Sequence, residues 1–295
     1  MDLVSILYTI LIPAVLILVM LGLGLSLTLA DLKRVVVFPK AAAIGITGQL
    51  ILLPLLAFVL AYFLAPSPAV AVGAIILAAC PGGVTSNAYV FAVRADVALS
   101  VTLTAVVSFV TVLTIPLLTY VALLVFYQEG SIPDLPVLGM LRTLAMFTVV
   151  PISGGMIFRA LWPVLALRMV ETVRRVAIIV LILLIVAAAA SSYEVVIENA
   201  VGAGLLVIAL NLLSMGMGFG LARVFRLTTI QAVTITYEIG VQNISLALLV
   251  TLTLLDNPAF AITSLLYAVI MPISALGFIS VARKMLVAAE AGEPA

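Results

Sequence analysis

Long apolar stretches dominate this chain, and short polar connections separate them. Windows of about 20 apolar residues, the length that a helix needs to cross a bilayer, recur along its whole length. They predict membrane-spanning helices at residues 4–29, 41–64, 68–93, 97–127, 136–158, 176–192, 199–222, 229–255 and 258–282. The pattern is typical of an all-α polytopic membrane protein with about nine transmembrane helices.

Basic residues divide these connections into two kinds. Twelve of the 13 Lys and Arg residues follow odd-numbered spans, whereas the connections after even-numbered spans carry only acidic charges. By the positive-inside rule, the N-terminus is expected outside and the C-terminus in the cytoplasm. The exception, Arg142, lies about two turns into the fifth span and is expected to snorkel to the outer surface. Residues 162–175 are predicted to form a short interfacial helix on the cytoplasmic side.

The composition also indicates a membrane protein and limits the kinds of partner that are expected. Hydrophobic residues make up 66% of the chain and charged residues 8%, so the lipid bilayer is the expected surrounding. The formal net charge of +1 gives no indication of a nucleic-acid partner. The single cysteine, Cys80, excludes an intrachain disulfide.

One acidic residue, Glu238, falls at membrane depth. It lies in a polar segment, residues 234–245, inside the predicted span 229–255. An ionisable group at this depth needs a partner, a water-filled cavity or a bound ion. No Lys or Arg lies nearby in sequence, and the chain has no His, so the pattern favours a metal-cation site. The alternative is a protonated Glu that is hydrogen-bonded to a neighbouring helix.

Two predicted spans carry helix-breaking sequences. In the third, Pro81 is followed by two glycines, and Val84–Asn87 would then begin a second half-helix. Free N–H groups at such a helix start favour anions. In the eighth, Gly240 precedes two amide side chains, Gln242 and Asn243. The alternative is that both are ordinary kinks with packing roles.

The two interrupted spans are five positions apart in order. An odd separation places them in opposite orientations, as an inverted repeat requires. The chain is therefore predicted to be one membrane domain, 1–295, with a first half of four spans (1–127) and a second half of five (136–285). Two broken helices that cross at the midplane are the recurring geometry of a transporter binding site.

Three other polar residues within predicted spans are candidates for the same site. Ser100 and Thr104 share one face of the fourth span, and Gln49 lies in the second. Each has a simpler role available, because span hydroxyls usually bond back to their own helix and amides often join helices.

Several segments together resemble the bile acid:sodium symporter family, specifically its bacterial members. The resemblance rests on Gly22–Leu29, on Cys80-Pro-Gly-Gly-Val-Thr-Ser-Asn87, on Ala98-Leu-Ser-Val-Thr-Leu-Thr-Ala105 and on Glu238-Ile-Gly-Val-Gln-Asn243. It implies a core domain and a panel domain, with two sodium ions beside crossed, discontinuous helices. Family members with ten spans are built as five plus five, so this chain would lack the first span.

The resemblance also implies the ligand sets, carried over by motif. One sodium would be held by Ser86, Asn87, Ser100, Thr104 and Glu238. The second would be held by Glu238, Gln242 and the carbonyls of Ile239 and Val241, with Gln49 close by. Such oxygen ligands suit a hard cation. The organic substrate would face Asn243 and the half-helix start formed by Val84, Thr85 and Ser86.

The expected function is therefore sodium-coupled symport of a small organic anion by alternating access, in a bacterial inner membrane. Sodium would act as a coupling ion, and no cofactor is expected. A proton-coupled or uncoupled carrier remains an alternative, as does a related permease for arsenite or a hormone-like anion, which Cys80 would suit. A membrane sensor or scaffold is a further alternative. An intramembrane enzyme has least support, because no second carboxylate is available to pair with Glu238.

Overall fold

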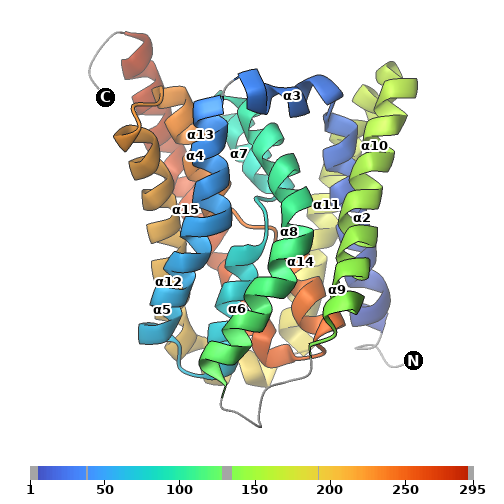
Figure 1. The fold of residues 1–295 in the computed structure, drawn as a ribbon, viewed down its shortest axis with the longest axis vertical. Helices are drawn as coiled ribbons and strands as arrows, with labels where there is room; N and C mark the ends of the chain where they lie inside the picture. Colours follow the sequence, from blue (N-terminus) through green and yellow to red (C-terminus); the bar gives the residue numbers. More distant parts are fainter. Residues whose placement is uncertain (1–5, 38, 128–134, 192, 292–295) are drawn as a thin grey trace.

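The computed structural model describes residues 6–37, 39–127, 135–191 and 193–291. Every regular element in these ranges is helical, and α marks an α-helix whereas η marks a π-helical segment. The elements are η1 (Leu7–Leu11), α2 (Ile12–Ser26), α3 (Leu29–Val37), α4 (Pro39–Thr47), η2 (Gly48–Leu52), α5 (Leu53–Leu64), α6 (Pro68–Ala79), α7 (Val84–Ala92), α8 (Val97–Phe126), α9 (Val137–Leu144), η3 (Ala145–Val149), α10 (Val150–Leu161), α11 (Pro163–Ser191), α12 (Tyr193–Val224), α13 (Thr229–Gly240), α14 (Ile244–Leu248), η4 (Leu249–Leu254) and α15 (Pro258–Glu290) (Figure 1).

Within these ranges, seven continuous helices are long and apolar enough to cross a membrane. They are Leu7–Ser26, Pro39–Leu64, Val97–Phe126, Val137–Leu161, Pro163–Ser191, Val201–Val224 and Pro258–Ala289. The protein is thus a multi-pass, all-helical membrane protein, as predicted. The other two predicted spans are interrupted helices, α6–α7 and α13–α14–η4. The count of nine spans and the four-plus-five repeat stay predictions.

The connection between the first two spans contains a helix that the hydropathy pattern did not indicate. The predicted span 4–29 ends early, because Leu27 is extended (φ −96°, ψ 144°). Thr28 and Asp31 then begin α3 reciprocally: the Asp31 carboxylate accepts from the Thr28 backbone N–H (2.9 Å), and the Thr28 hydroxyl accepts from the Asp31 N–H (3.2 Å). This is the logic of a capping box.

The predicted interfacial helix at residues 162–175 is not a separate element. α10 ends at Leu161, and Pro163 opens α11, where its missing N–H costs nothing. From there α11 continues without a break through the predicted span 176–192. Its 29 residues make a helix of about 43 Å, longer than the roughly 30 Å hydrocarbon core, so its charged first turns can lie outside the hydrocarbon.

The helices pack in two groups. α2 contacts α10 and α11 most extensively, whereas α12 packs on α13 and α15, and α6 packs on α8 and α15. Glycines allow α2 and α10 to approach closely: a Cβ on Gly24 would lie 2.2 Å from the carbonyl oxygen of Ile152. The assignment of these groups to a panel and a core remains an expectation.

The connections that carry basic residues gather at one end of the bundle. Figure 1 places α3, the α7–α8, α10–α11 and α12–α13 connections and the end of α15 at its upper end, and the start of α2 near its lower end. This arrangement matches the segregation of Lys and Arg in the sequence. The identity of the basic end as cytoplasmic stays a prediction.

Candidate functional site at the helix crossing

The two predicted helix breaks are present in the structure. α6 stops at Cys80, which is extended (φ −71°, ψ 153°), because the following Pro81 disfavours a helical conformation in the residue before it. α13 stops at Val241 (φ −113°, ψ 104°). α14 begins where the Asn243 side-chain oxygen accepts from the N–H of Leu246 (3.1 Å), as an N-cap does.

The breaks lie against each other and satisfy each other's backbone. Two antiparallel hydrogen bonds join them, Gly83 N–H to Val241 O (3.2 Å) and Asn243 N–H to Pro81 O (3.0 Å), and together they form the bridge between Gly82 and Gln242. Non-helical backbone at membrane depth needs partners of this kind, because lipid offers none. The crossing is therefore a fixed point at which both interrupted helices expose side chains and helix ends.

Glu238 lies beside this crossing, with 1% of its surface exposed. One carboxylate oxygen, Oε2, accepts from the hydroxyls of Ser86 (2.9 Å) and Ser100 (2.8 Å). The other oxygen, Oε1, accepts from Thr104. Asn87 joins the cluster through its side-chain oxygen, 2.6 Å from the Ser100 hydroxyl. The five residues predicted for the first sodium thus come together from α7, α8 and α13.

This carboxylate cluster has more acceptors than donors. Its three hydroxyl groups supply three protons, and their other oxygen neighbours include the carbonyl of Gly83 (2.6 Å from Ser86) and that of Ser100 (3.0 Å from Thr104). Among the residues that the structure describes, no basic side chain forms an ion pair with Glu238. A buried carboxylate without a counter-charge is expensive, and a hard cation among these oxygens would supply it.

The residues predicted for the second sodium form an adjoining chain of amides. The Gln49 side-chain N–H donates to Gln242 Oε1 (2.9 Å) and to the carbonyl of Cys80 (2.7 Å), and Gln242 donates to the carbonyl of Ile239 (2.7 Å). The Val241 carbonyl accepts a backbone N–H from the other break. Gln49 Oε1 is buried without a hydrogen-bond partner among the described residues, so an acceptor is left for a cation.

The break at the end of α13 is also held by residues of α12 and α15. The sequence pattern did not single these residues out. The carbonyl of Gly240 accepts from the hydroxyl of Tyr267 (2.8 Å) and from the side-chain amide of Asn211 (3.1 Å). Ser274 in turn donates to Asn211. Two donors on one carbonyl fix the peptide that lies between the Ile239 and Val241 carbonyls. The available signal was Asn211, an amide in the middle of the apolar stretch of α12.

A small cavity of about 210 Å³ adjoins the crossing. Val84, Thr85 and Asn243 line it, and α2, α11 and α15 complete its wall. Ser86, which was also expected to face the substrate, lies in the carboxylate cluster and does not line this cavity. Cys80 is also absent from the lining, and its thiol donates to the carbonyl of Ile76 (3.3 Å) in its own helix.

Two features of the small cavity suit an anion. The side-chain NH₂ of Asn243 is buried, and no residue in the described part of the chain accepts a hydrogen bond from it. The first turn of α7, which opens at Val84, has no side-chain cap. The Ser86 N–H donates back to the carbonyl of Gly83 (2.9 Å), and the N–H groups of Val84 and Thr85 lie at the positive end of the helix dipole.

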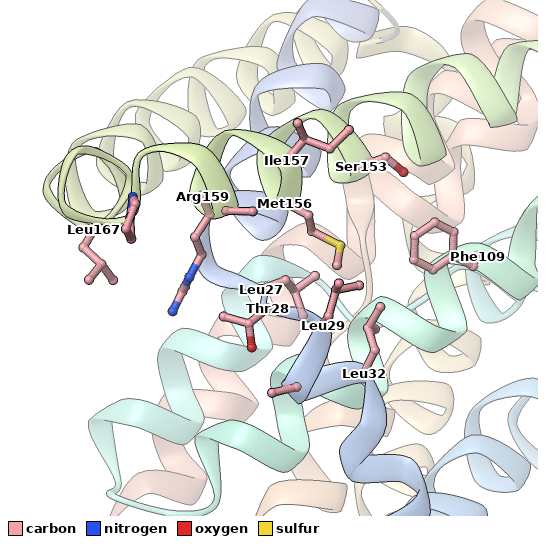
Figure 2. Close-up of a pocket in the computed structure, with 13 residues that line it drawn as sticks. Leu27, Thr28, Leu29, Leu32, Phe109, Ser153, Met156, Ile157, Arg159 and Leu167 are labelled. Carbon is pink, nitrogen blue, oxygen red and sulfur yellow. The ribbon is translucent and has the colours of Figure 1, made fainter.

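A larger cavity of about 810 Å³ lies near the basic end, between α3, α8 and α10 (Figure 2). Apolar side chains such as Met156 and Phe109 form most of its wall. Of the described residues that line it, only Arg159 is charged, and this side chain donates to the carbonyl of Leu25 (3.1 Å). Figure 2 shows Arg159 reaching from α10 toward the start of α3.

Comparison with known proteins identifies relatives of this chain. The sequence profile of the sodium bile acid symporter family matches residues 13–199. A Bacillus subtilis protein described as an uncharacterized sodium-dependent transporter, YocS, is 28% identical over 255 residues, which are 85% of this chain and 76% of that protein. A rice protein described as the probable chloroplastic sodium/metabolite cotransporter BASS2 is 26% identical over 85% of this chain and 59% of its own length.

A third relative aligns over a shorter part. The rat hepatic sodium/bile acid cotransporter is 29% identical over 52% of this chain and 42% of its own length. The chain therefore spans less than two thirds of the plant and rat relatives. The Bacillus and rice matches leave only about 44 of the 295 residues outside, so both include the two breaks and Glu238. Because the family profile matches more than half of its length, this chain belongs to the sodium bile acid symporter family.

Proposed function

We propose that the protein is a secondary transporter that couples sodium entry to the import of a small organic anion. The observation that carries this proposal is Glu238, a buried carboxylate without a basic partner among the described residues, which accepts from three hydroxyls at the crossing. Structural roles for a buried Glu need a counter-charge or a matching set of donors. A bound and transported cation would supply the counter-charge that Glu238 lacks.

In this proposal two sodium ions bind side by side. The first is held by the carboxylate cluster, in which Ser86, Asn87, Ser100, Thr104 and Glu238 supply the oxygens. The second is held by Glu238, by the carbonyls of Ile239 and Val241, and by Gln242 and Gln49. The free Gln49 Oε1 supports the second assignment, because a buried acceptor without a donor is rare.

The small cavity is the proposed substrate site. Asn243 and the N–H groups that open α7 would bind the anionic group, and the apolar wall would contact the rest of the molecule. Pockets for drug-sized ligands enclose roughly 300–1,000 Å³. The cavity of about 210 Å³ is smaller, which favours a compact carboxylate over a steroid-sized anion.

Coupling follows from elements that the two ligands share. α7 contributes Ser86 and Asn87 to the first sodium site, and Val84 and Thr85 to the substrate cavity. Sodium binding would therefore order the start of α7, which also binds the anion. Each ligand would then raise the affinity of the site for the other. Movement of α2, α10 and α11 against the remaining helices would expose the site to each side in turn.

The test needs no knowledge of the substrate. Thermal unfolding of the purified protein would be followed while sodium chloride replaces potassium or choline chloride at constant ionic strength. We expect saturable, sodium-selective stabilisation in the wild type and its loss in Glu238→Ala. The near-isosteric Glu238→Gln variant serves if the Ala variant does not fold. Sodium-selective stabilisation that persists in both variants would exclude the proposed ligand sets.

The same titration separates the main competitor. A proton-coupled carrier would use Glu238 as a proton acceptor, so its stability would respond to pH and show no preference for sodium over potassium. Absence of sodium selectivity in the folded wild type would therefore overturn the sodium proposal.

A further inference from the structure

A positively charged hollow lies away from the crossing, at the basic end of the bundle. It encloses about 410 Å³ between the end of α7, the start of α13 and the last turns of α15. Arg94 and Arg283 line it together with the apolar residues Ile230, Leu286 and Val287. A neighbouring hollow of about 430 Å³ shares Arg283 and Val287 and adds Lys284.

Among the described residues, no ion pair neutralises the two arginines of this hollow. Arg283 donates to the carbonyl of Ala92 at the end of α7 (3.1 Å), and none of the described residues that line either hollow is acidic. Within the described part of the chain, neither Arg94 nor Arg283 forms an ion pair with a carboxylate. Two guanidinium groups that share one hollow repel each other, and a bound anion would remove this repulsion.

Arg94 is held in an unusual backbone conformation. Its φ of 62° lies in the left-handed region, where a residue other than Gly or Asn is disfavoured by about 1–2 kcal/mol. The turn is closed by a hydrogen bond from the Arg94 N–H to the carbonyl of Phe91 (3.1 Å). The turn between α7 and α8 fixes this conformation, as similar turns do at Arg226 (φ 51°) and Asp256 (φ 46°), and it sets the direction in which the Arg94 side chain leaves the backbone.

The position of Arg283 along α15 would place the hollow in the lipid headgroup layer, for a helix that enters the membrane at Pro258. Arg283 follows Pro258, the first residue of α15, by 25 residues, which at about 1.5 Å per residue places it about 37 Å along the helix. The hydrocarbon core is only about 30 Å thick, and headgroups extend the bilayer to roughly 40–45 Å. Apolar side chains beside the arginines remain open, since Val287 is 66% exposed and Ile230 43% exposed.

From this combination we propose that the hollow binds the headgroup of an anionic phospholipid. The phosphate oxygens bind between Arg94 and Arg283, and the acyl chains run along Ile230 and Val287. Charge alone would also attract free phosphate, but the exposed apolar residues at headgroup depth favour a lipid. The bound lipid would tie α15 to the end of α7 and the start of α13, the helices that carry Ser86 and Glu238.

Lipid titration of the purified protein in detergent tests the site. Phosphatidylglycerol and phosphatidylcholine would be added in parallel to the wild type and to an Arg94→Gln/Arg283→Gln double variant. We expect phosphatidylglycerol alone to raise the Tm of the wild type, by about 3 °C or more at tenfold excess over its dissociation constant. The double variant should lose most of this shift.

Matched controls make the result specific. Arg142→Gln removes an exposed arginine in α9, and Arg226→Gln removes one beside the start of α13; both should keep the full shift. If the double variant does not fold, Arg94→Gln is used alone, because it leaves the bond from Arg283 to Ala92 in place. An equal shift in the arginine variants and the wild type would overturn the proposal. An equal shift with inorganic phosphate at matched ionic strength would replace the lipid by a free anion.

Discussion

At the scale of single residues, the hydroxyls around Glu238 have two positions open to their protons. Each hydroxyl lies within hydrogen-bond distance of the carboxylate and also of a second acceptor: Gly83 O for Ser86, Asn87 Oδ1 for Ser100, and Ser100 O for Thr104. A hydroxyl can rotate between such acceptors. When a cation binds, each hydroxyl can rotate its proton from the carboxylate to its second acceptor and turn an oxygen lone pair toward the cation. Each hydroxyl then still donates one hydrogen bond. Ser and Thr suit this exchange because each carries one rotatable proton.

Thr104→Ala should weaken sodium binding without abolishing it. Hydrogen bonds to charged groups contribute about 1.5–3 kcal/mol, so we expect the midpoint of sodium-dependent stabilisation to rise about tenfold or more. Transport should recover at high sodium. Ser108→Ala is the matched control, because this buried hydroxyl of α8 donates only to the carbonyl of Thr104 (2.6 Å). Equal effects of the two substitutions would argue against a ligand role for Thr104.

Tyr267→Phe tests whether the Gly240 peptide must be held in place. Loss of the hydroxyl frees the carbonyl that lies between two proposed sodium ligands, and we expect the sodium midpoint to rise about threefold, the equivalent of roughly 0.7 kcal/mol. Tyr237→Phe is the control, since its buried hydroxyl donates to the carbonyl of Ala275 (3.2 Å) instead. A Tyr267→Phe variant with lower Tm but unchanged sodium midpoint would limit this residue to a structural role.

At the scale of elements, the crossing depends on how closely the α6–α7 break approaches α13. A Cβ on Gly82 would lie 2.4 Å from Glu238 Oε1, which is closer than any ordinary contact. Gly82→Ala should therefore displace the carboxylate and eliminate sodium-selective stabilisation. Gly216→Ala, in α12, has no atom within 4 Å of the added Cβ and should leave the sodium response unchanged. A normal sodium response in Gly82→Ala would mean that the carboxylate can move without consequence.

The helix elements were predictable wherever one local signal decided them. Apolar length located the continuous spans, and Pro81 with its two glycines marked the first break. The course of α11 was not predictable from hydropathy, because its first turns are charged. They remain helical since their residues are good helix formers and Arg175 pairs with Glu171 one turn earlier (2.9 Å).

The site was predictable for similar reasons, and only in part. Polar segments inside apolar spans are unusual, and they make Glu238, Asn87 and Gln242 recognisable as candidates from the sequence. Tyr267 and Asn211 lie outside these segments, in the apolar helices α15 and α12, and what they bind is decided by the packing of α12 and α15 on α13. A linear sequence does not specify that contact, and a lone Asn or Tyr in a span has many other uses.

At the scale of the whole molecule, two sodium ions and one monovalent anion would carry one net positive charge inward. Each elementary charge gains about 2.3 kcal/mol per 100 mV of membrane potential, so uptake should be electrogenic. Addition of substrate to proteoliposomes in a sodium gradient should evoke a current that Glu238→Ala abolishes. Sodium-dependent uptake without current would mean one sodium per anion.

The bridge between Gly82 and Gln242 also has a consequence for biosynthesis. The first break leaves the ribosome about 160 residues before the segment that completes its hydrogen bonds. At synthesis rates of roughly 5–20 residues per second, it waits about 8–32 s for that partner. During this interval the N–H of Gly83 and the carbonyl of Pro81 have to be satisfied by water or by the insertion machinery, because lipid satisfies neither. The first half of the chain therefore enters the membrane before the backbone hydrogen bonds of its break can form.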